Sequence, residues 1–171
     1  MISKTLEKAI NLQINKELYS EYLYVAMQAW FANQNLDGFA NWMMVQGKEE
    51  HDHAMKFFNY VIERGGSVEL LAIEKPPKTF TKPLKAFQMA LEHEQFITKS
   101  INQLMDLAIK ESDHAAKSFL QWYVDEQVEE EANADKIVHK LEMIKDNPQG
   151  LYMLDNELAQ RVYVPLATAS T

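Results

Sequence analysis

Cysteine is absent from the 171-residue sequence, and glycine and proline each occur only five times. Without cysteine the protein can form no disulfide, no thiolate metal site and no cysteine nucleophile. An all-β protein would need more turn residues than these few glycines and prolines supply. No apolar run approaches the roughly 18 residues that span a bilayer, so we expect no membrane partner.

The composition is that of an acidic globular protein. Hydrophobic residues make up 47% of the chain and charged residues 25%, which excludes a disordered chain and suits a single domain over residues 1–171. Lys and Arg number 17 against 25 Asp and Glu, and the net charge of −8 repels nucleic acid and attracts cations. The polar segment Met1–Lys8 interrupts any apolar signal segment, which together with the lack of cysteine favours a cytoplasmic location.

The helix-breaking residues are clustered, and long stretches of helix formers lie between the clusters. Asp37 is placed to act as the N-cap of the second stretch, and Pro83 suits the first turn of the third. The sequence therefore predicts an all-α fold with four long helices and a short fifth one. Their expected bounds are about 5–33, 37–64, 83–111, 114–145 and 151–163.

Residues 65–82 show no helical period, and a structureless segment of this length in a compact domain needs a structural role. A helix of about 28 residues is ~42 Å long, whereas about 18 extended residues reach roughly 59 Å. The segment can therefore cross the whole length of a four-helix bundle and make the second and third helices parallel. Four apolar side chains favour this packed crossover over a loose surface loop between antiparallel helices: Val68, Leu71, Ile73 and Phe80.

Each long helix has a track of core-facing positions at three- and four-residue steps. These tracks are largely apolar at their ends but polar near the helix midpoints. The polar residues within about one turn of the midpoints are Glu17, Glu50, His53, Glu94, Gln127 and Glu130. Because helices of equal length in a bundle have their midpoints at one level, we expect these side chains to converge at its centre.

Four carboxylates cannot share an apolar core as unpaired anions, because burying each charge costs several kcal/mol. No lysine or arginine lies on the core-facing central stretches to pair with them. They must therefore be protonated or hold cations, and carboxylates with one histidine suit iron or manganese, and zinc somewhat less. Four carboxylates would balance two divalent ions. The alternative is a hydrated polar layer whose members hydrogen-bond to one another.

On these residues the chain resembles the ferritin family, specifically the non-haem ferritins of bacteria. The similarity covers the four long helices, the crossover segment and the short fifth helix. The residues that carry it are Glu17, Tyr24, Glu49-Glu50-His51-Asp52-His53, Glu94 and Glu126-Gln127-Val128-Glu129-Glu130. The resemblance implies a ferritin-like four-helix bundle with a long crossover between its second and third helices.

The resemblance also implies roles for individual residues. One iron would be held by Glu17, Glu50 and His53. Glu50 would bridge to a second iron, which Glu94 and Glu130 complete, with Gln127 and Tyr24 beside the centre. A third iron site is implied at Glu49, Glu126 and Glu129, with Glu130 shared between it and the second iron. Without the resemblance, those three glutamates would be interpreted as a solvated acidic face.

Differences from related families narrow the interpretation. The fourth helix carries Gln127-x-x-Glu130 instead of a second E-x-x-H, which is not the bacterioferritin pattern, and His51 replaces the methionine that haem-binding relatives have there. We therefore expect no haem. The lack of cysteine excludes a rubrerythrin, and no basic N-terminal tail of the DNA-protecting kind is present. The stretch His114–Ser118 lacks the acidic residues that line the threefold pores of animal ferritins.

The resemblance implies an iron-storage protein with ferroxidase activity, which oxidises Fe(II) with dioxygen or peroxide and stores the ferric mineral inside a 24-subunit shell. An apolar stripe on the fifth helix, too large for one bundle to bury, would favour such a homo-oligomer: Leu151, Leu154, Leu158 and Val162. Two alternatives stay open at this point. One is a discrete di-iron or di-manganese oxidase, and the other is a helical interaction module with no tight metal site.

Overall fold

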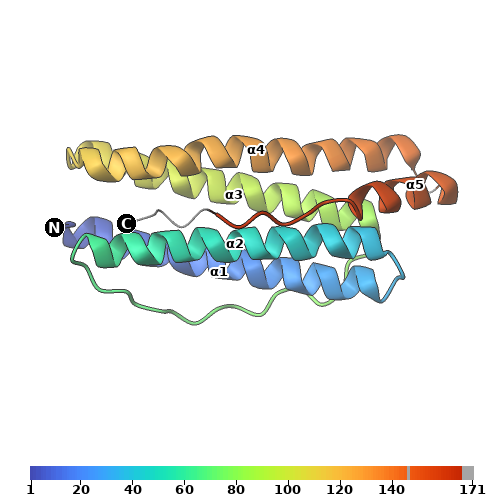
Figure 1. The fold of residues 1–171 in the computed structure, drawn as a ribbon, viewed down its shortest axis with the longest axis horizontal. Helices are drawn as coiled ribbons and strands as arrows, with labels where there is room; N and C mark the ends of the chain where they lie inside the picture. Colours follow the sequence, from blue (N-terminus) through green and yellow to red (C-terminus); the bar gives the residue numbers. More distant parts are fainter. Residues whose placement is uncertain (146, 167–171) are drawn as a thin grey trace.

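The computed structural model describes residues 1–145 and 147–166. Within these residues the chain forms five helices, shown in Figure 1. Their bounds are α1 Lys4–Ala32, α2 Asp37–Glu63, α3 Pro83–Lys110, α4 His114–Ile144 and α5 Pro148–Leu158. The all-α prediction is confirmed, and the four long helices lie close to their expected bounds. None of the helices in the described part of the chain has an apolar stretch long enough to cross a membrane.

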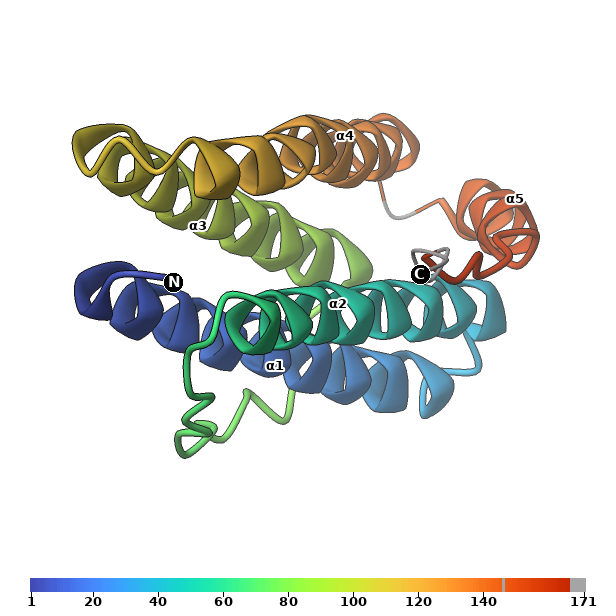
Figure 2. The same cartoon turned by 60° about the vertical axis from the view of Figure 1, so that its left-hand side comes forward.

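The crossover prediction is also confirmed. The segment between α2 and α3 runs the length of the bundle along α1, so that α2 and α3 are parallel (Figures 1 and 2). The side chain of Asn11 donates to the carbonyl of Ser67 at 2.9 Å and accepts from the Glu69 amide at 2.9 Å. These bonds hold the segment against α1 because they pair backbone groups that a loose loop would leave to water.

The four apolar residues expected to pack the crossover segment differ in burial. Phe80 is buried, with its ring centroid 5.6 Å from that of Trp30, and Val68 is partly buried. Leu71 and Ile73 are 37% and 41% exposed, so the expectation that they pack on the bundle was wrong. The segment lies on the outer surface of α1, where one face of it stays in solvent.

The N-terminus of α2 is capped from outside its own sequence. Asp37 is the first residue of α2, not its cap as predicted, and the preceding Leu36 makes no side-chain cap bond. Instead Asp155 of α5 accepts from the Gly38 and Phe39 amides at 2.8 and 3.0 Å. A Cβ on Gly38 would lie 1.7 Å from the Asp155 carbonyl oxygen, so glycine is required for this approach of α5 to α2.

The fifth helix differs most from its expected range of 151–163. It begins at Pro148, since the Asn147 side chain caps it by accepting from the Gly150 amide at 3.0 Å. It ends at Leu158, and the chain then runs back along α2 (Figure 1). Leu158 is buried within this one chain, as is Leu154, while Val162 is 77% exposed. The four residues of the predicted stripe therefore do not form one continuous helical face that a neighbouring subunit could cover.

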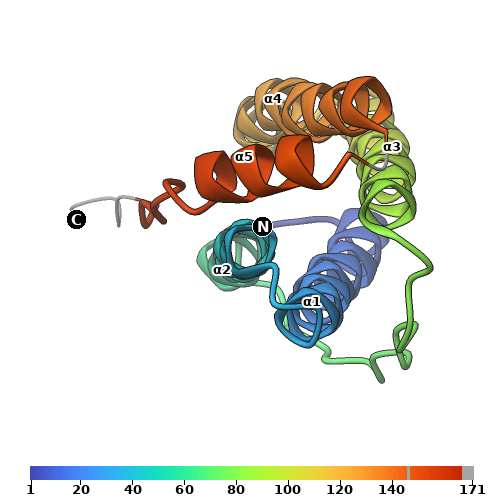
Figure 3. The ribbon, with the colours of Figure 1, turned by 90° about the vertical axis from the view of Figure 1, so that its right-hand side faces the viewer.

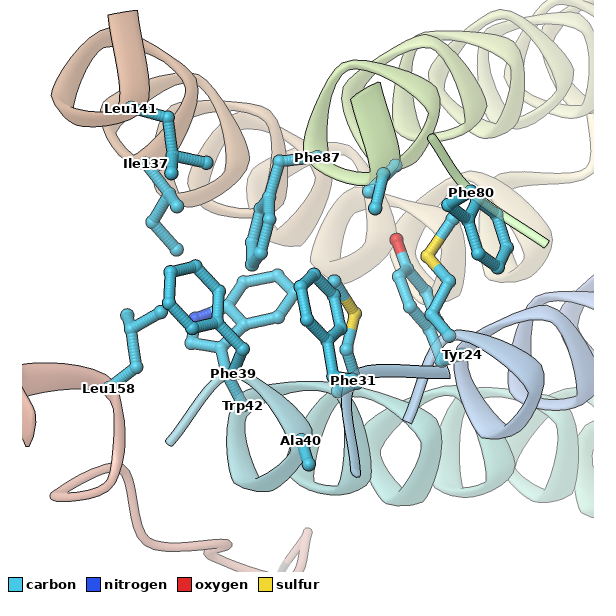
Figure 4. Close-up of a cluster of buried hydrophobic side chains, with 14 of the residues drawn as sticks. Tyr24, Phe31, Phe39, Ala40, Trp42, Phe80, Phe87, Ile137, Leu141 and Leu158 are labelled. Atoms are coloured by element: carbon cyan, nitrogen blue, oxygen red, sulfur yellow. The ribbon is translucent and has the colours of Figure 1, made fainter. Parts of the chain in front are cut away.

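The core consists of two apolar clusters at opposite ends of the bundle, and α3 and α4 cover α1 and α2 in the end view of Figure 3. The first cluster is aromatic and includes Phe31, Phe39 and Phe87, with Leu158 of α5 at its edge (Figure 4). The second is built around Leu6, Ile10 and stacked aromatic rings of α2 and α4. The predicted polar residues lie between the two.

Candidate metal centre

All six residues predicted at the bundle centre are buried. Their exposed fractions are between 1% and 4%, and they come from all four long helices: Glu17, Glu50, His53, Glu94, Gln127 and Glu130. The helical period explains this convergence, because each lies on the core-facing track near its helix midpoint. The bundle therefore encloses four carboxylic groups and an imidazole.

Three of these side chains are arranged as a metal ligand set. Glu17, Glu50 and His53 each offer one ligand atom, and these atoms lie within 4.8 Å of one another. The Oε2 atom of Glu17 is buried and has no hydrogen-bond partner among the described residues. An unpartnered buried carboxylate oxygen is costly, and a bound cation would remove that cost. The donor set of two carboxylates and one imidazole therefore fits iron.

Glu94 is held by residues beside it. Tyr24 donates a short hydrogen bond to its Oε1 atom, and Gln127 donates to its Oε2 atom at 3.2 Å. Gln127 also donates to the Glu94 carbonyl at 3.2 Å. Tyr24 and Gln127 therefore lie beside the candidate centre, in contact with Glu94.

Two buried glutamines that sequence reasoning did not single out orient the other carboxylates. Gln46 donates from one amide nitrogen to Glu50 at 3.1 Å and to Glu130 at 2.7 Å. Gln13 donates to Glu17 at 2.8 Å. Both glutamines precede a central glutamate by four residues on the same helix, so their side chains share its face. That spacing was the signal that could have identified them.

The three glutamates implied as a third iron site lie in less buried surroundings. Glu126 is half-buried and forms a second potential ligand group with His53 and Glu130, again within 4.8 Å. Glu129 is exposed and belongs to neither group found among the described residues. Glu49 is paired with Arg161, whose Nη2 atom lies 2.5 Å from its Oε2 atom. Burial raises the pKa of Glu49, Arg161 opposes this shift, and Glu126 and Glu129 add to it.

The four central carboxyl groups have strongly raised pKa values. Burial, and after it the charge of a neighbouring carboxylate, raises the pKa of each to about 8: Glu17, Glu50, Glu94 and Glu130. They interact with one another, so their protons leave as a coupled set. Without metal the centre therefore retains protons at neutral pH, and a cation that binds there must displace them.

A four-helix bundle that encloses carboxylates and a histidine at its centre is typical of helical metal-binding proteins. The family described as a ferritin-like domain matches residues 7–144, and the chain therefore belongs to the ferritin family. It is 43% identical to the bacterial non-heme ferritin of Campylobacter jejuni, over 91% of this chain and 93% of that one. The corresponding protein of Bacteroides fragilis is 40% identical, over 94% of this chain and all of that one.

Solved structures give the same result. An open pore ferritin from the hyperthermophilic archaeon Archaeoglobus fulgidus superimposes with a TM-score of 0.94 at 50% identity, covering 95% of this chain and 100% of that one. The likeness extends over the four long helices and beyond them. Family membership supports iron storage, and the group of Glu17, Glu50 and His53 is a candidate iron-binding site within that family.

Proposed function

We propose that this chain is an iron-storage ferritin with ferroxidase activity. It oxidises Fe(II) to Fe(III) with dioxygen or peroxide at the bundle centre, and stores the ferric mineral inside a shell of 24 copies in the cytoplasm. The observation that carries the proposal is the buried Oε2 atom of Glu17, which lies beside Glu50 and His53 and has no hydrogen-bond partner in the part of the chain that the structure describes. Family membership and the ferritin neighbours support iron as the substrate and an oligomeric shell.

In this proposal two Fe(II) ions bind as substrates, and each supplies one electron to the oxidant. Glu17, Glu50 and His53 bind one ion, and Glu50 bridges to the other. Glu94 and Glu130 complete the second position, where Tyr24 and Gln127 hold Glu94 in place. Carboxylates are hard anionic ligands that favour Fe(III) over Fe(II), and their fixed positions determine the separation of the two ions.

The proton content of the centre supports the same chemistry. Because the pKa values of the central carboxyl groups are raised to about 8, Fe(II) binding would release protons from them at neutral pH. Glu49, Glu126 and Glu129 would form a third iron position next to Glu130. This position lies on the half-buried side of α2 and α4, between the centre and solvent.

The experiment is anaerobic loading of the whole protein with Fe(II), followed by air, with native mass and iron content measured before and after. We expect a large closed oligomer that takes up far more iron per subunit than its ligand positions can bind. Uptake that stops at the ligand positions, although oxidation is fast, would indicate a discrete di-iron oxidase. Monomers or dimers at micromolar concentration would rule out the storage shell.

A further inference from the structure

The residues that follow α5 form a segment bound to the outside of α2. We call residues 159–166 the C-terminal strap; it runs back along α2 from the end of α5 (Figure 1). Asn41 donates to the carbonyl of Arg161 at 2.9 Å near its start. Asp52 accepts from the Tyr163 hydroxyl at 2.6 Å and from the Leu166 amide at 3.2 Å near its end. The strap is therefore attached at Arg161 itself and again near its far end.

The guanidinium group of Arg161 lies between the strap and the candidate metal centre. Its guanidinium lies 4.5 Å from the ring centroid of Trp42 and donates to Gln46 Oε1 at 2.9 Å and to Glu49 Oε2 at 2.5 Å. These partners follow one another at three- or four-residue steps, so they line one face of α2. The pair with Glu49 is largely shielded, with exposed fractions of 20% and 24% for the two side chains.

The bond to Gln46 links Arg161 to the central carboxyl groups. Because the Gln46 carbonyl oxygen accepts from Arg161, its amide nitrogen points inward, where it donates to Glu50 and Glu130. A side-chain amide whose carbonyl oxygen faces one direction must direct its NH2 group the other way. Arg161 thus fixes the orientation of a side chain that contacts two proposed iron ligands, although it contacts neither of them itself.

Arg161 also binds the carboxylate of Glu49, which a metal ion at the third position would have to bind. A guanidinium and a divalent ion on the same carboxylate repel each other, and Glu49 Oε2 is already engaged at hydrogen-bond distance. Glu126 and Glu129, which act on Glu49 electrostatically, add negative charge that attracts either cation. One positive partner at Glu49 therefore weakens the binding of the other.

We propose that Arg161 is an internal cation that competes with metal for Glu49, so that metal binding there displaces the guanidinium and loosens the C-terminal strap from α2. The inference rests on the proposed function, since it takes Glu49 as a ligand of the third iron position. It makes the strap a regulator of that position, because a metal ion binds at Glu49 only where it displaces the guanidinium of Arg161.

The first test is calorimetric titration of the metal-free protein with Zn(II), a redox-silent substitute for Fe(II), in the parent and in Arg161→Gln. We expect the weakest class of sites to bind Zn(II) at least tenfold more tightly in the variant. Lys140→Gln is the matched control, because it removes the same charge from a pair with Glu157 between α4 and α5. Equal affinities for every class of site in the parent and Arg161→Gln would overturn the proposal.

The second test needs no substitution. Hydrogen exchange of the peptide that covers the strap is followed while Zn(II) is added to the parent. We expect exchange to accelerate severalfold only as the weakest sites fill, and to be fast at every Zn(II) level in Glu49→Gln. Unchanged protection of the strap with those sites filled would overturn the proposal. Absence of any tight Zn(II) site in the parent would instead refute the proposed function, so the two failures are distinguishable.

Discussion

The aromatic end of the bundle and its polar centre are built from the same helices with the same period. The aromatic end buries apolar rings, whereas the centre buries ionisable side chains. At the aromatic end, Phe31 stacks on Phe39 with centroids 5.1 Å apart, and Phe87 lies 5.9 Å from Phe39 (Figure 4). At the centre the same track positions hold Glu17, Glu50 and their carboxyl neighbours. The aromatic end is complete without a ligand, whereas the centre needs protons or metal.

The difference shows how the protein tolerates an unfavourable site. Burying an aromatic side chain stabilises the fold by roughly 2–3 kcal/mol, whereas burying an unpaired carboxylate costs several kcal/mol. The apolar clusters on both sides of the centre offset that cost and hold the four helices in register. The two apolar clusters therefore set the positions of the central carboxyl groups. The protons or metal ions bound between these groups determine their charge.

The largest effect is expected from removing ligands at the centre. Glu50→Ala and His53→Ala should each slow Fe(II) oxidation about 10³-fold or more. The first variant would remove the ligand shared by the two irons and with it their fixed separation, and the second would remove the imidazole ligand of one iron. Stopped-flow absorbance under air measures the rate. Glu63→Ala, an exposed glutamate on the same helix, is the control and should be unchanged. Parental rates in both ligand variants would refute the site.

A substitution at the aromatic end should have the reverse pattern. Phe39→Ala removes a fully buried ring and should lower the free energy of unfolding by about 3 kcal/mol, because it leaves a cavity. The affinity for Zn(II) at the centre should stay within a factor of a few, as measured by calorimetry at a temperature where the variant is folded. A large loss of affinity would mean that the two regions are not separable.

The pH dependence of stability should differ between metal-free and metal-bound protein. The central carboxyl groups have folded-state pKa values raised to about 8, so the folded metal-free protein binds more protons than the unfolded chain between about pH 4.5 and 8. Their contribution to stability is present at low pH and is lost as pH rises through this window, by ~1.4 kcal/mol per pH unit for each proton.

Metal should reverse that trend, because it competes with the same protons. We therefore expect the gain in thermal midpoint from anaerobic Fe(II) or from Zn(II) to shrink as pH falls from neutral toward the carboxylate range. Thermal scans with and without metal at several pH values measure it. A gain that is independent of pH would show that the metal does not bind these groups.

A smaller effect is expected when two of the carboxylates are neutralised. Without metal near neutral pH, the double variant Glu94→Gln with Glu130→Gln should be more stable than the parent by ~1 kcal/mol. The buried Glu94 and Glu130 keep protons that the unfolded chain releases, whereas glutamine takes up no proton on folding. The double variant should gain less from Zn(II) than the parent does. Denaturant unfolding with and without the ion tests both. Lower stability of the variant without metal, combined with an undiminished gain, would contradict a strained metal site.

Much of the candidate site could be predicted because it depends on local period. Glu17, Glu50, Glu94 and Glu130 each lie near the midpoint of a long helix, and equal helices in a bundle bring their midpoints together. The crossover between α2 and α3 was predictable for a similar reason, since its length and lack of period admit few other paths. These features need no knowledge of a particular long-range contact.

The amino-acid sequence by itself determined the helices, the core-facing tracks and the carboxylates at their centre, because the helical repeat converts spacing directly into a shared face. Only the tertiary structure decided the contacts of α5 and the C-terminal strap with α2. Asp155 caps α2 in place of Asp37, and Arg161 reaches Gln46 across 115 positions of sequence. No periodicity relates residues so far apart; their meeting depends on how α5 packs against the finished bundle.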